Sequence, residues 1–273
     1  MAPSCVPAVP GEDNGAILDG DMLHKLQANP RILGLGEVMD CYSVINSDPY
    51  MMKKLDYFKD TIMDGHIIGL SPEQVASYRL AGITPNHECI SYEETKEHVT
   101  NGIYVWIREG SAGHNLDSIV KGLVEEQGNT ERYGFCTDDK HIEEIQREGH
   151  INYNVKRAVQ LGLAPEKALK MATIQAARCY GLKHLGAIAP GYQADLVVLD
   201  NLRDMNVLEV YHKGIKIQKD EKTEIRPCSP YLKNTVHLNN FSEKDLRLVH
   251  TGEKAHVLQM VEGRIVTEDL VEE

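Results

Sequence analysis

A regular alternation of short apolar runs and amphipathic segments across residues 31–217 most constrains the fold of this chain. Each apolar run ends on a polar residue, and a stretch with helical spacing of apolar side chains follows it. The expected strands lie within Ile32–Met39, Thr61–Ile67, Gly82–Cys89, Ile103–Glu109 and Tyr133–Asp138. The expected helices are Pro49–Lys59, Pro72–Ala81, Tyr92–Asn101 and Leu116–Gln127. This order predicts an α/β fold with parallel strands and right-handed crossovers.

The spacing of the repeat is compatible with a (β/α)₈ barrel. The matching points Glu37, His66, His87, Arg108 and Asp138 are separated by 29, 21, 21 and 30 residues. A barrel of this type averages roughly 31 residues per strand–helix unit. An open doubly wound sheet would show the same alternation, so the rhythm alone leaves both architectures open.

Near residue 190 the alternating strand and helix patterns give way to successive extended patterns. Extended patterns follow one another at Ala194–Asp200, Val207–Ile217, Val236–Leu238, Leu246–His250 and Ala255–Val266. Turn signals occur at Lys213-Gly214 and Glu262-Gly263, and the polar stretch Lys219–Asn234 is expected to be a loop. We therefore divide the chain into an α/β domain, residues 1–190, and a small β-rich domain, residues 191–273.

Charge and cysteine content exclude several classes of function. The chain has 41 acidic and 29 basic residues, a net charge of -12, which argues against a nucleic-acid partner because such proteins need a basic surface. Its six cysteines form no C-x-x-C pair, which favours a reducing compartment over a zinc ribbon or a disulfide framework. The N-terminal segment has no signal-peptide pattern, and no run approaches the roughly 18 apolar residues of a membrane span. We expect a cytoplasmic protein that has no membrane association.

The polar residues at the carboxyl ends of the expected strands are the candidate functional residues, because these ends form the active face of a barrel. Glu37, His66, His87 and Asp138 supply two imidazoles and two carboxylates from separate strands. Such a set suits zinc, iron or manganese. A metal held there would lower the pKa of bound water, and a nearby carboxylate or imidazole could move the proton.

Each of these residues also has an ordinary interpretation. A single histidine at a strand end is more often a hydrogen-bonded structural residue than a ligand, and we read His98 and most of the other histidines in that way. The segment Arg108–Ser111 could bind a substrate or simply pair with a neighbouring strand end. The zinc deaminase pattern of H-x-E followed by C-x-x-C is excluded, because Glu88 follows His87 directly and no C-x-x-C is present.

Several longer motifs resemble the bacterial adenine deaminases of the amidohydrolase superfamily. The matching stretches are Leu35–Met39, Asp64–His66, His87–Cys89, Ile107–Ala112, Phe135–His141, Glu148–Ile151, Lys170–Thr173 and Gly186–Asp195. They occur in order over about residues 3–217.

The resemblance implies hydrolysis of adenine to hypoxanthine and ammonia in purine salvage, with manganese or iron as the metal and zinc as a further possibility. It implies that Glu37 is a metal-bridging carboxylate, that His66 and His87 are ligands from the fifth and sixth strands, and that Asp138 binds metal and takes a proton from the attacking water. Four residues are implied to hold the purine: Asp139, Glu88, Arg108 and Ser111. Of these, Glu88 is also a catalytic candidate beside Asp138. The relatives are expected to be homo-oligomers in their full-length form.

The sequence also departs from that family. The superfamily opens its barrel with an H-x-H metal motif, whereas none of the twelve histidines here forms one. We therefore expect a partial barrel of TIM type, about strands 3 or 4 to 8, from an incomplete copy that lacks the H-x-H portion and the C-terminal region. Two alternatives stay open: a non-catalytic remnant that binds a partner, and an amidohydrolase acting on a different purine or a cyclic amide.

Overall fold

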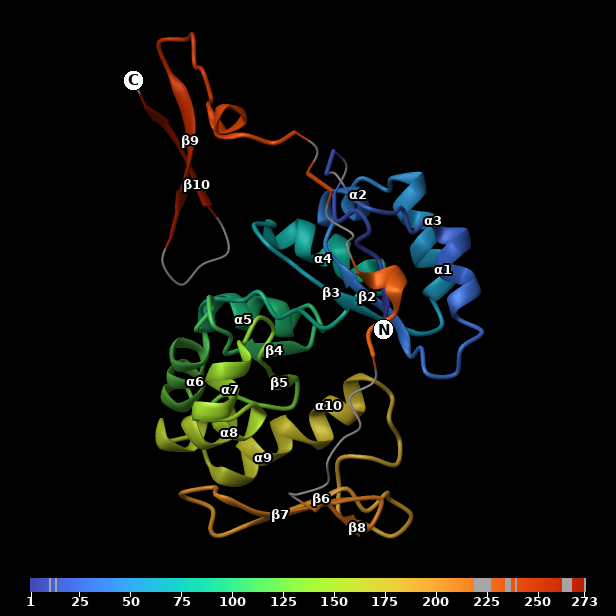
Figure 1. Cartoon of the computed structure of the whole chain (residues 1–273). Coiled ribbons are helices and arrows are strands. Elements are labelled where there is room, and N and C mark those ends of the chain that lie inside the picture. The colour runs from blue at the N-terminus through green and yellow to red at the C-terminus, as the bar shows by residue number, and fades with distance from the viewer. Residues whose placement is uncertain are drawn as a thin grey trace.

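The computed structural model describes residues 1–9, 11–12, 14–218, 227–233, 237–238, 240–261 and 267–272. Helices and parallel strands alternate over the first part of the chain, and antiparallel strands follow in the last part (Figure 1). Among the described helices, none is both long and apolar enough to cross a membrane.

The parallel strands form two groups. The first sheet has the order β1-β2-β3, with β1 (Ala2–Pro3), β2 (Gly34–Val38) and β3 (Ile62–Gly65) all parallel. The second sheet pairs β4 (Val105–Arg108) with β5 (Tyr133–Cys136), again in parallel. Four of the five predicted apolar runs therefore contain a strand, and the predicted parallel arrangement is confirmed.

The fifth predicted run, Gly82–Cys89, connects the two sheets without being a regular strand. The Thr84 amide donates to the Met63 carbonyl at 2.8 Å, and the Trp106 amide donates to the Asn86 carbonyl at 2.8 Å. Between them, Pro85 has no amide hydrogen to continue a ladder. The strands and this segment follow one another in a single parallel order. The described residues do not close into a barrel, so the part of the prediction that is confirmed is the mixed α/β architecture.

The first five helices that flank these strands begin at a residue whose side chain caps the helix. Their bounds are α1 Gly20–Leu26, α2 Cys41–Ile45, α3 Pro49–Phe58, α4 Pro72–Leu80, α5 Tyr92–Thr100, α6 Leu116–Glu125, α7 Ile142–Glu148, α8 Ile151–Gln160, α9 Pro165–Ala172 and α10 Ile174–Cys179. Ser71 and Gln74 form a reciprocal capping box at the start of α4. All four predicted helices are present, and each matches the predicted range to within two residues at either end.

Two hydrophobic cores support the two sheets. Leu35, Phe58 and Tyr78 belong to the first core, which joins β2 and β3 to the early helices. Ile107 and Met171 belong to the second core, which joins β4 and β5 to α5, α6, α8 and α9. The segment between Thr84 and Glu88 runs from one sheet to the other, and side chains from both meet beside it.

The last part of the chain forms two separate antiparallel sheets. β6 (Leu196–Leu199), β7 (Val207–His212) and β8 (Ile215–Lys216) make the order β6-β7-β8, and the predicted turn at Lys213-Gly214 joins the last two. β9 (Ala255–Met260) pairs with β10 (Thr267–Glu272) in a hairpin. Among the described residues, strands occur within three of the five extended segments expected after residue 190: Ala194–Asp200, Val207–Ile217 and Ala255–Val266.

Some predicted extended segments differ. Residues 247–250 contain no strand, and the 3₁₀ helix η2 (Glu243–Leu246) precedes them, because Ser242 and Asp245 cap each other and favour a tight turn. Within the expected loop, Pro230–Leu232 forms the 3₁₀ helix η1. The Glu262-Gly263 turn lies outside the described residues, as does part of Val236–Leu238.

Candidate metal centre

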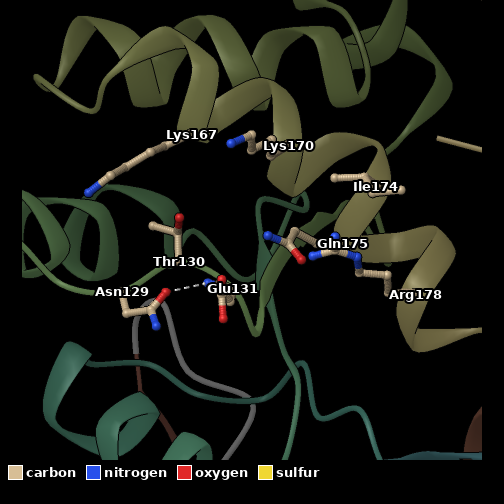
Figure 2. Close-up of a pocket in the computed structure, with 8 residues that line it drawn as sticks. All are labelled: Asn129, Thr130, Glu131, Lys167, Lys170, Ile174, Gln175 and Arg178. Carbon is tan, nitrogen blue, oxygen red and sulfur yellow. Dashed lines mark hydrogen bonds between the residues drawn. The ribbon is translucent and has the colours of Figure 1, made fainter. Parts of the chain in front are cut away.

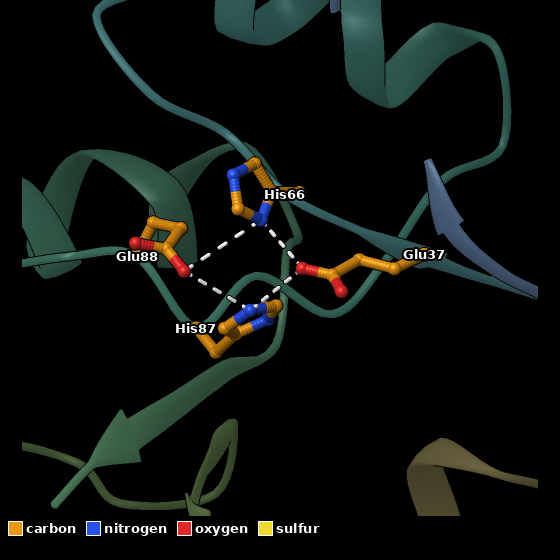
Figure 3. A group of neighbouring side chains, drawn as sticks. All are labelled: Glu37, His66, His87 and Glu88. Atoms are coloured by element: carbon orange, nitrogen blue, oxygen red, sulfur yellow. Dashed lines mark hydrogen bonds and ion pairs between the residues drawn. The ribbon is translucent and has the colours of Figure 1, made fainter. Parts of the chain in front are cut away.

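Three of the four predicted metal ligands converge at the carboxyl ends of the parallel segments (Figure 3). Glu37 lies near the end of β2, His66 follows β3, and His87 follows the segment that joins the sheets. The Glu37 Oε1 atom is 2.5 Å from His66 Nδ1 and 2.9 Å from His87 Nε2. The spacing of the polar strand ends along the sequence therefore corresponds to a real cluster in space.

Glu88 occupies the fourth position of this cluster. Its Oε1 atom is 3.1 Å from His87 Nε2 and 3.6 Å from His66 Nδ1. One potential ligand atom from each of Glu37, His66, His87 and Glu88 lies within 4.8 Å of the others. We call these four residues the imidazole–carboxylate cluster. Sequence reasoning placed Glu88 near the substrate, but its immediate succession to His87 already indicated that it lies close to a ligand.

The charges within the cluster are strongly coupled. Burial would raise the pKa of Glu37, but hydrogen bonds from His66 and His87 lower it to about 2. Burial would lower the pKa of His87, whereas hydrogen bonds to Glu37 and Glu88 raise it to about 10. The two carboxylates thus favour a positive charge on the imidazole of His87.

Arg108 connects the cluster to the next strand end. It is 1% exposed at the end of β4, and its Nη1 atom is 2.7 Å from Glu88 Oε1 and 2.8 Å from Asp138 Oδ2. The guanidinium packs directly over Gly113, where an added Cβ would lie 2.6 Å from Nε and Nη2. Neither Nε nor Nη2 has a hydrogen-bond partner among the described residues. Arg108 is therefore held as a fixed donor between two carboxylates.

Asp138 is not a member of the imidazole–carboxylate cluster. It follows β5, has a φ of 46°, and its partly exposed side chain is paired with Arg108. Aspartate tolerates this left-handed backbone conformation better than most residues. Its carboxylate is held by Arg108 and lies outside the cluster, and its predicted roles as a metal ligand and a proton acceptor stay predictions.

The other two predicted substrate residues support a loop at the rim. The Asp139 carboxylate accepts hydrogen bonds from the amides of Ser111 and Ala112, at 3.2 and 2.8 Å. The Ser111 hydroxyl is bonded to the Glu144 carboxylate and accepts from the His141 amide at 2.9 Å. Gly110 is required beside them, because an added Cβ would lie 1.7 Å from Asp139 Oδ1. Their assignment to purine binding stays a prediction.

A second group of potential ligands was missed from the sequence. Cys89, Glu94 and His98 lie within 4.8 Å of one another, and the Cys89 Sγ atom is 2.8 Å from His98 Nδ1. Burial lowers the pKa of His98 to about 4 and raises that of Cys89, so both groups are neutral. The one-turn spacing of Glu94 and His98 on α5 was the available signal.

Imidazoles and carboxylates, a donor set that suits a divalent cation, are gathered at the carboxyl ends of parallel segments in an α/β fold. The sequence model of the Amidohydrolase family matches residues 1–216, and the chain belongs to that family.

Comparison with individual proteins gives a narrower relationship. The chain is 52% identical over 267 residues to the adenine deaminase of Desulfitobacterium hafniense (strain Y51), which covers 98% of this chain and 47% of that protein. It is 40% identical to the adenine deaminase of Bacillus licheniformis, with coverage of 98% and 47%. The chain thus spans about half the length of the curated relatives it matches.

One solved structure supports the fold. The β-aspartyl dipeptidase of Fervidobacterium islandicum AW-1 superimposes with a TM-score of 0.54 at 15% identity, over 73% of this chain and 61% of that chain. This similarity concerns the architecture alone.

Proposed function

We propose that this chain contributes to an adenine deaminase, which hydrolyses adenine to hypoxanthine and ammonia. The observation that carries the proposal is the imidazole–carboxylate cluster, found in a chain that is 52% identical to an adenine deaminase across nearly its whole length. The substrate is a small molecule, which is compatible with a site at the ends of strands.

The cluster fits a divalent cation. Two imidazole nitrogens and two carboxylate oxygens are suitable donors for manganese, iron or zinc. The lowered pKa of Glu37 and the raised pKa of His87 support a site that favours positive charge. Glu37, His66 and His87 would hold the metal, with Glu88 beside them. A divalent metal in this place supplies the acidification of water that hydrolysis at neutral pH requires.

The remaining residues would position and move protons. Asp138 would accept a proton from the attacking water as its oxygen forms a bond to C6, and would return it to the exocyclic nitrogen, which leaves as ammonia when the C6–N bond breaks. Arg108 holds the carboxylates of Asp138 and Glu88 through one nitrogen, at 2.8 and 2.7 Å. Asp139 and Ser111 order the rim loop on which the purine would rest.

The proposal also covers the domain organisation of the chain. We assign residues 1–190 to part of a (β/α)₈ barrel of TIM type that carries the hydrolase site, and residues 191–273 to a β-rich region beside it. The metal we favour is manganese or iron. A homo-oligomer in a cytoplasmic setting remains our expectation for the full-length relatives.

A chimera tests the proposal directly. The 267-residue stretch that this chain matches in the Desulfitobacterium hafniense enzyme would be replaced by the present sequence, and hypoxanthine formation would be followed by chromatography. We expect turnover in the chimera, its loss on Asp138→Asn, and its retention on Asp56→Asn at an exposed ion pair. A folded chimera that binds manganese but forms no hypoxanthine would contradict the proposal.

A further inference from the structure

A basic cavity lies away from the imidazole–carboxylate cluster, at the opposite end of β5. Its volume is about 330 Å³, within the range of small-molecule sites. Helices α9 and α10 and the loop before β5 line it, with Lys167, Lys170, Gln175 and Arg178 on the helices and Asn129, Thr130 and Glu131 on the loop. Figure 2 shows Lys167, Gln175 and Arg178 projecting from the helices toward the loop.

The charge of this cavity is unusual for the chain. Three cations, Lys167, Lys170 and Arg178, line it together with one carboxylate, Glu131, in a protein whose net charge is -12. Within the described ranges, none of the three cations has a carboxylate within 4.0 Å. Cations gathered without partners repel one another, so the cavity favours an anion.

Two buried polar side chains complete the lining. Gln175 is 3% exposed, and its Oε1 atom has no donor among the residues that the structure describes. Thr130 is 7% exposed and lines the cavity from the loop before β5. A buried acceptor without a donor costs free energy, which a ligand with an N–H or O–H group would recover.

We propose that this cavity binds a phosphate monoester whose organic part carries hydroxyl or amine donors, such as a sugar phosphate or a nucleoside monophosphate. Three cations against one carboxylate leave a formal charge of +2, which matches a phosphate monoester with close to two negative charges at pH 7. Lysine and arginine bind the phosphoryl oxygens, and Gln175 Oε1 accepts from the organic part. The volume is too large for a phosphate ion alone.

Strand β5 and helix α10 connect the cavity with the neighbourhood of the cluster. Thr130 precedes β5 and Asp138 follows it, so the cavity and the cluster lie at opposite ends of that strand. Helix α10, which carries Gln175 and Arg178, is followed by Tyr180, whose hydroxyl donates to Asp64 Oδ2 at 2.9 Å beside the cluster.

Calorimetric titration of the whole chain tests the proposal, with ribose 5-phosphate, AMP, inorganic phosphate and adenosine as probes at low salt. We expect at least one of the two esters to bind at least about tenfold more tightly than both phosphate and adenosine. Tighter binding of AMP would assign a nucleotide, and tighter binding of ribose 5-phosphate would assign a sugar phosphate. If neither ester binds more tightly than phosphate or adenosine, the proposal is wrong.

Variants separate this site from nonspecific attraction and from the metal centre. Arg178→Gln and Lys167→Gln should each weaken ester binding at least about tenfold, while both proteins keep the circular dichroism of the parent. Lys183→Gln removes the same charge from an exposed position outside the lining and should change binding less than about twofold. His87→Ala should leave ester binding intact, so the outcome does not depend on the proposed deaminase activity. Equal effects of Lys183→Gln and Arg178→Gln would overturn the proposal.

Discussion

Asp138 lies beside Arg108, not beside the imidazoles: its Oδ2 atom is 2.8 Å from Nη1, the same nitrogen that donates to Glu88 at 2.7 Å. A buried guanidinium therefore stands between Asp138 and the imidazole–carboxylate cluster. In this arrangement the imidazole–carboxylate cluster would hold the metal, and the Asp138 carboxylate, which lies across the guanidinium, would move the proton. The two roles can be tested independently.

Asp138→Asn should abolish deamination in the chimera while manganese affinity changes less than about threefold. Asparagine tolerates the φ of 46° and preserves the side-chain shape, but it cannot accept a proton from water. Turnover and metal affinity would be measured on the same preparation. A parallel loss of manganese binding would instead make Asp138 a ligand.

Arg108→Met should destabilise the fold by about 3 kcal/mol, because it leaves the buried Glu88 carboxylate without its guanidinium. Adding Glu88→Gln should recover part of this loss, since the uncompensated charge is removed. Urea unfolding of the single and double variants measures both effects. Arg157→Met, at a partly exposed pair with Asp117, is the matched control and should cost less than about 1 kcal/mol. A double variant less stable than Arg108→Met alone would contradict the buried-pair interpretation.

Gly110→Ala should disrupt the rim loop, because its Cβ would lie 1.7 Å from Asp139 Oδ1 and 2.9 Å from the Thr137 carbonyl oxygen. Displacing Asp139 would break its bonds to the amides of Ser111 and Ala112, at a cost of about 2 kcal/mol. Thermal unfolding gives the measurement. Gly15→Ala, where no atom lies within 4 Å of the added carbon, should be neutral. If Gly110→Ala and Gly15→Ala were equally stable, the rim loop would not depend on the close approach of Gly110 to Asp139.

Stability should fall as the pH falls from 6.5 toward 4, in part through His98. Burial lowers the pKa of this imidazole to about 4, so the unfolded state binds the proton first and is favoured in that range. The full effect is on the order of 3 kcal/mol. In His98→Gln the free energy of unfolding should depend less on pH, and groups common to both proteins cancel in the difference. Parallel pH profiles of the two proteins would contradict a neutral buried His98.

Much of the fold was predictable because local signals and tertiary packing agree. The Ser71 capping box predicted the start of α4, and apolar runs ending on Glu37 and His66 predicted strands whose ends meet. The segment around Pro85 was predicted as a strand, since its apolar pattern is strand-like although proline cannot complete the ladder. Periodicity could not reveal barrel closure, because it describes single elements and not their assembly.

The sequence predicted which residues gather at the strand ends, but not which side chains pair with one another. Strand-end spacing brought Glu37, His66 and His87 together, and the structure adds Glu88 to them. That Asp138 faces Arg108 depends on the direction of its side chain at a backbone position with positive φ, which spacing cannot encode. The basic cavity joins residues about 40 positions apart, from Thr130 to Lys170, and left no local pattern in the sequence.

The most direct test is a manganese titration of the chelator-treated chain, with bound metal counted after gel filtration. We predict one ion per chain, loss of binding on His66→Ala or His87→Ala, and retention on His24→Ala, which lies on α1 away from the cluster. Binding that survives both His66→Ala and His87→Ala, or a folded chain that takes up no divalent metal, would contradict the assignment of the imidazole–carboxylate cluster as the metal centre.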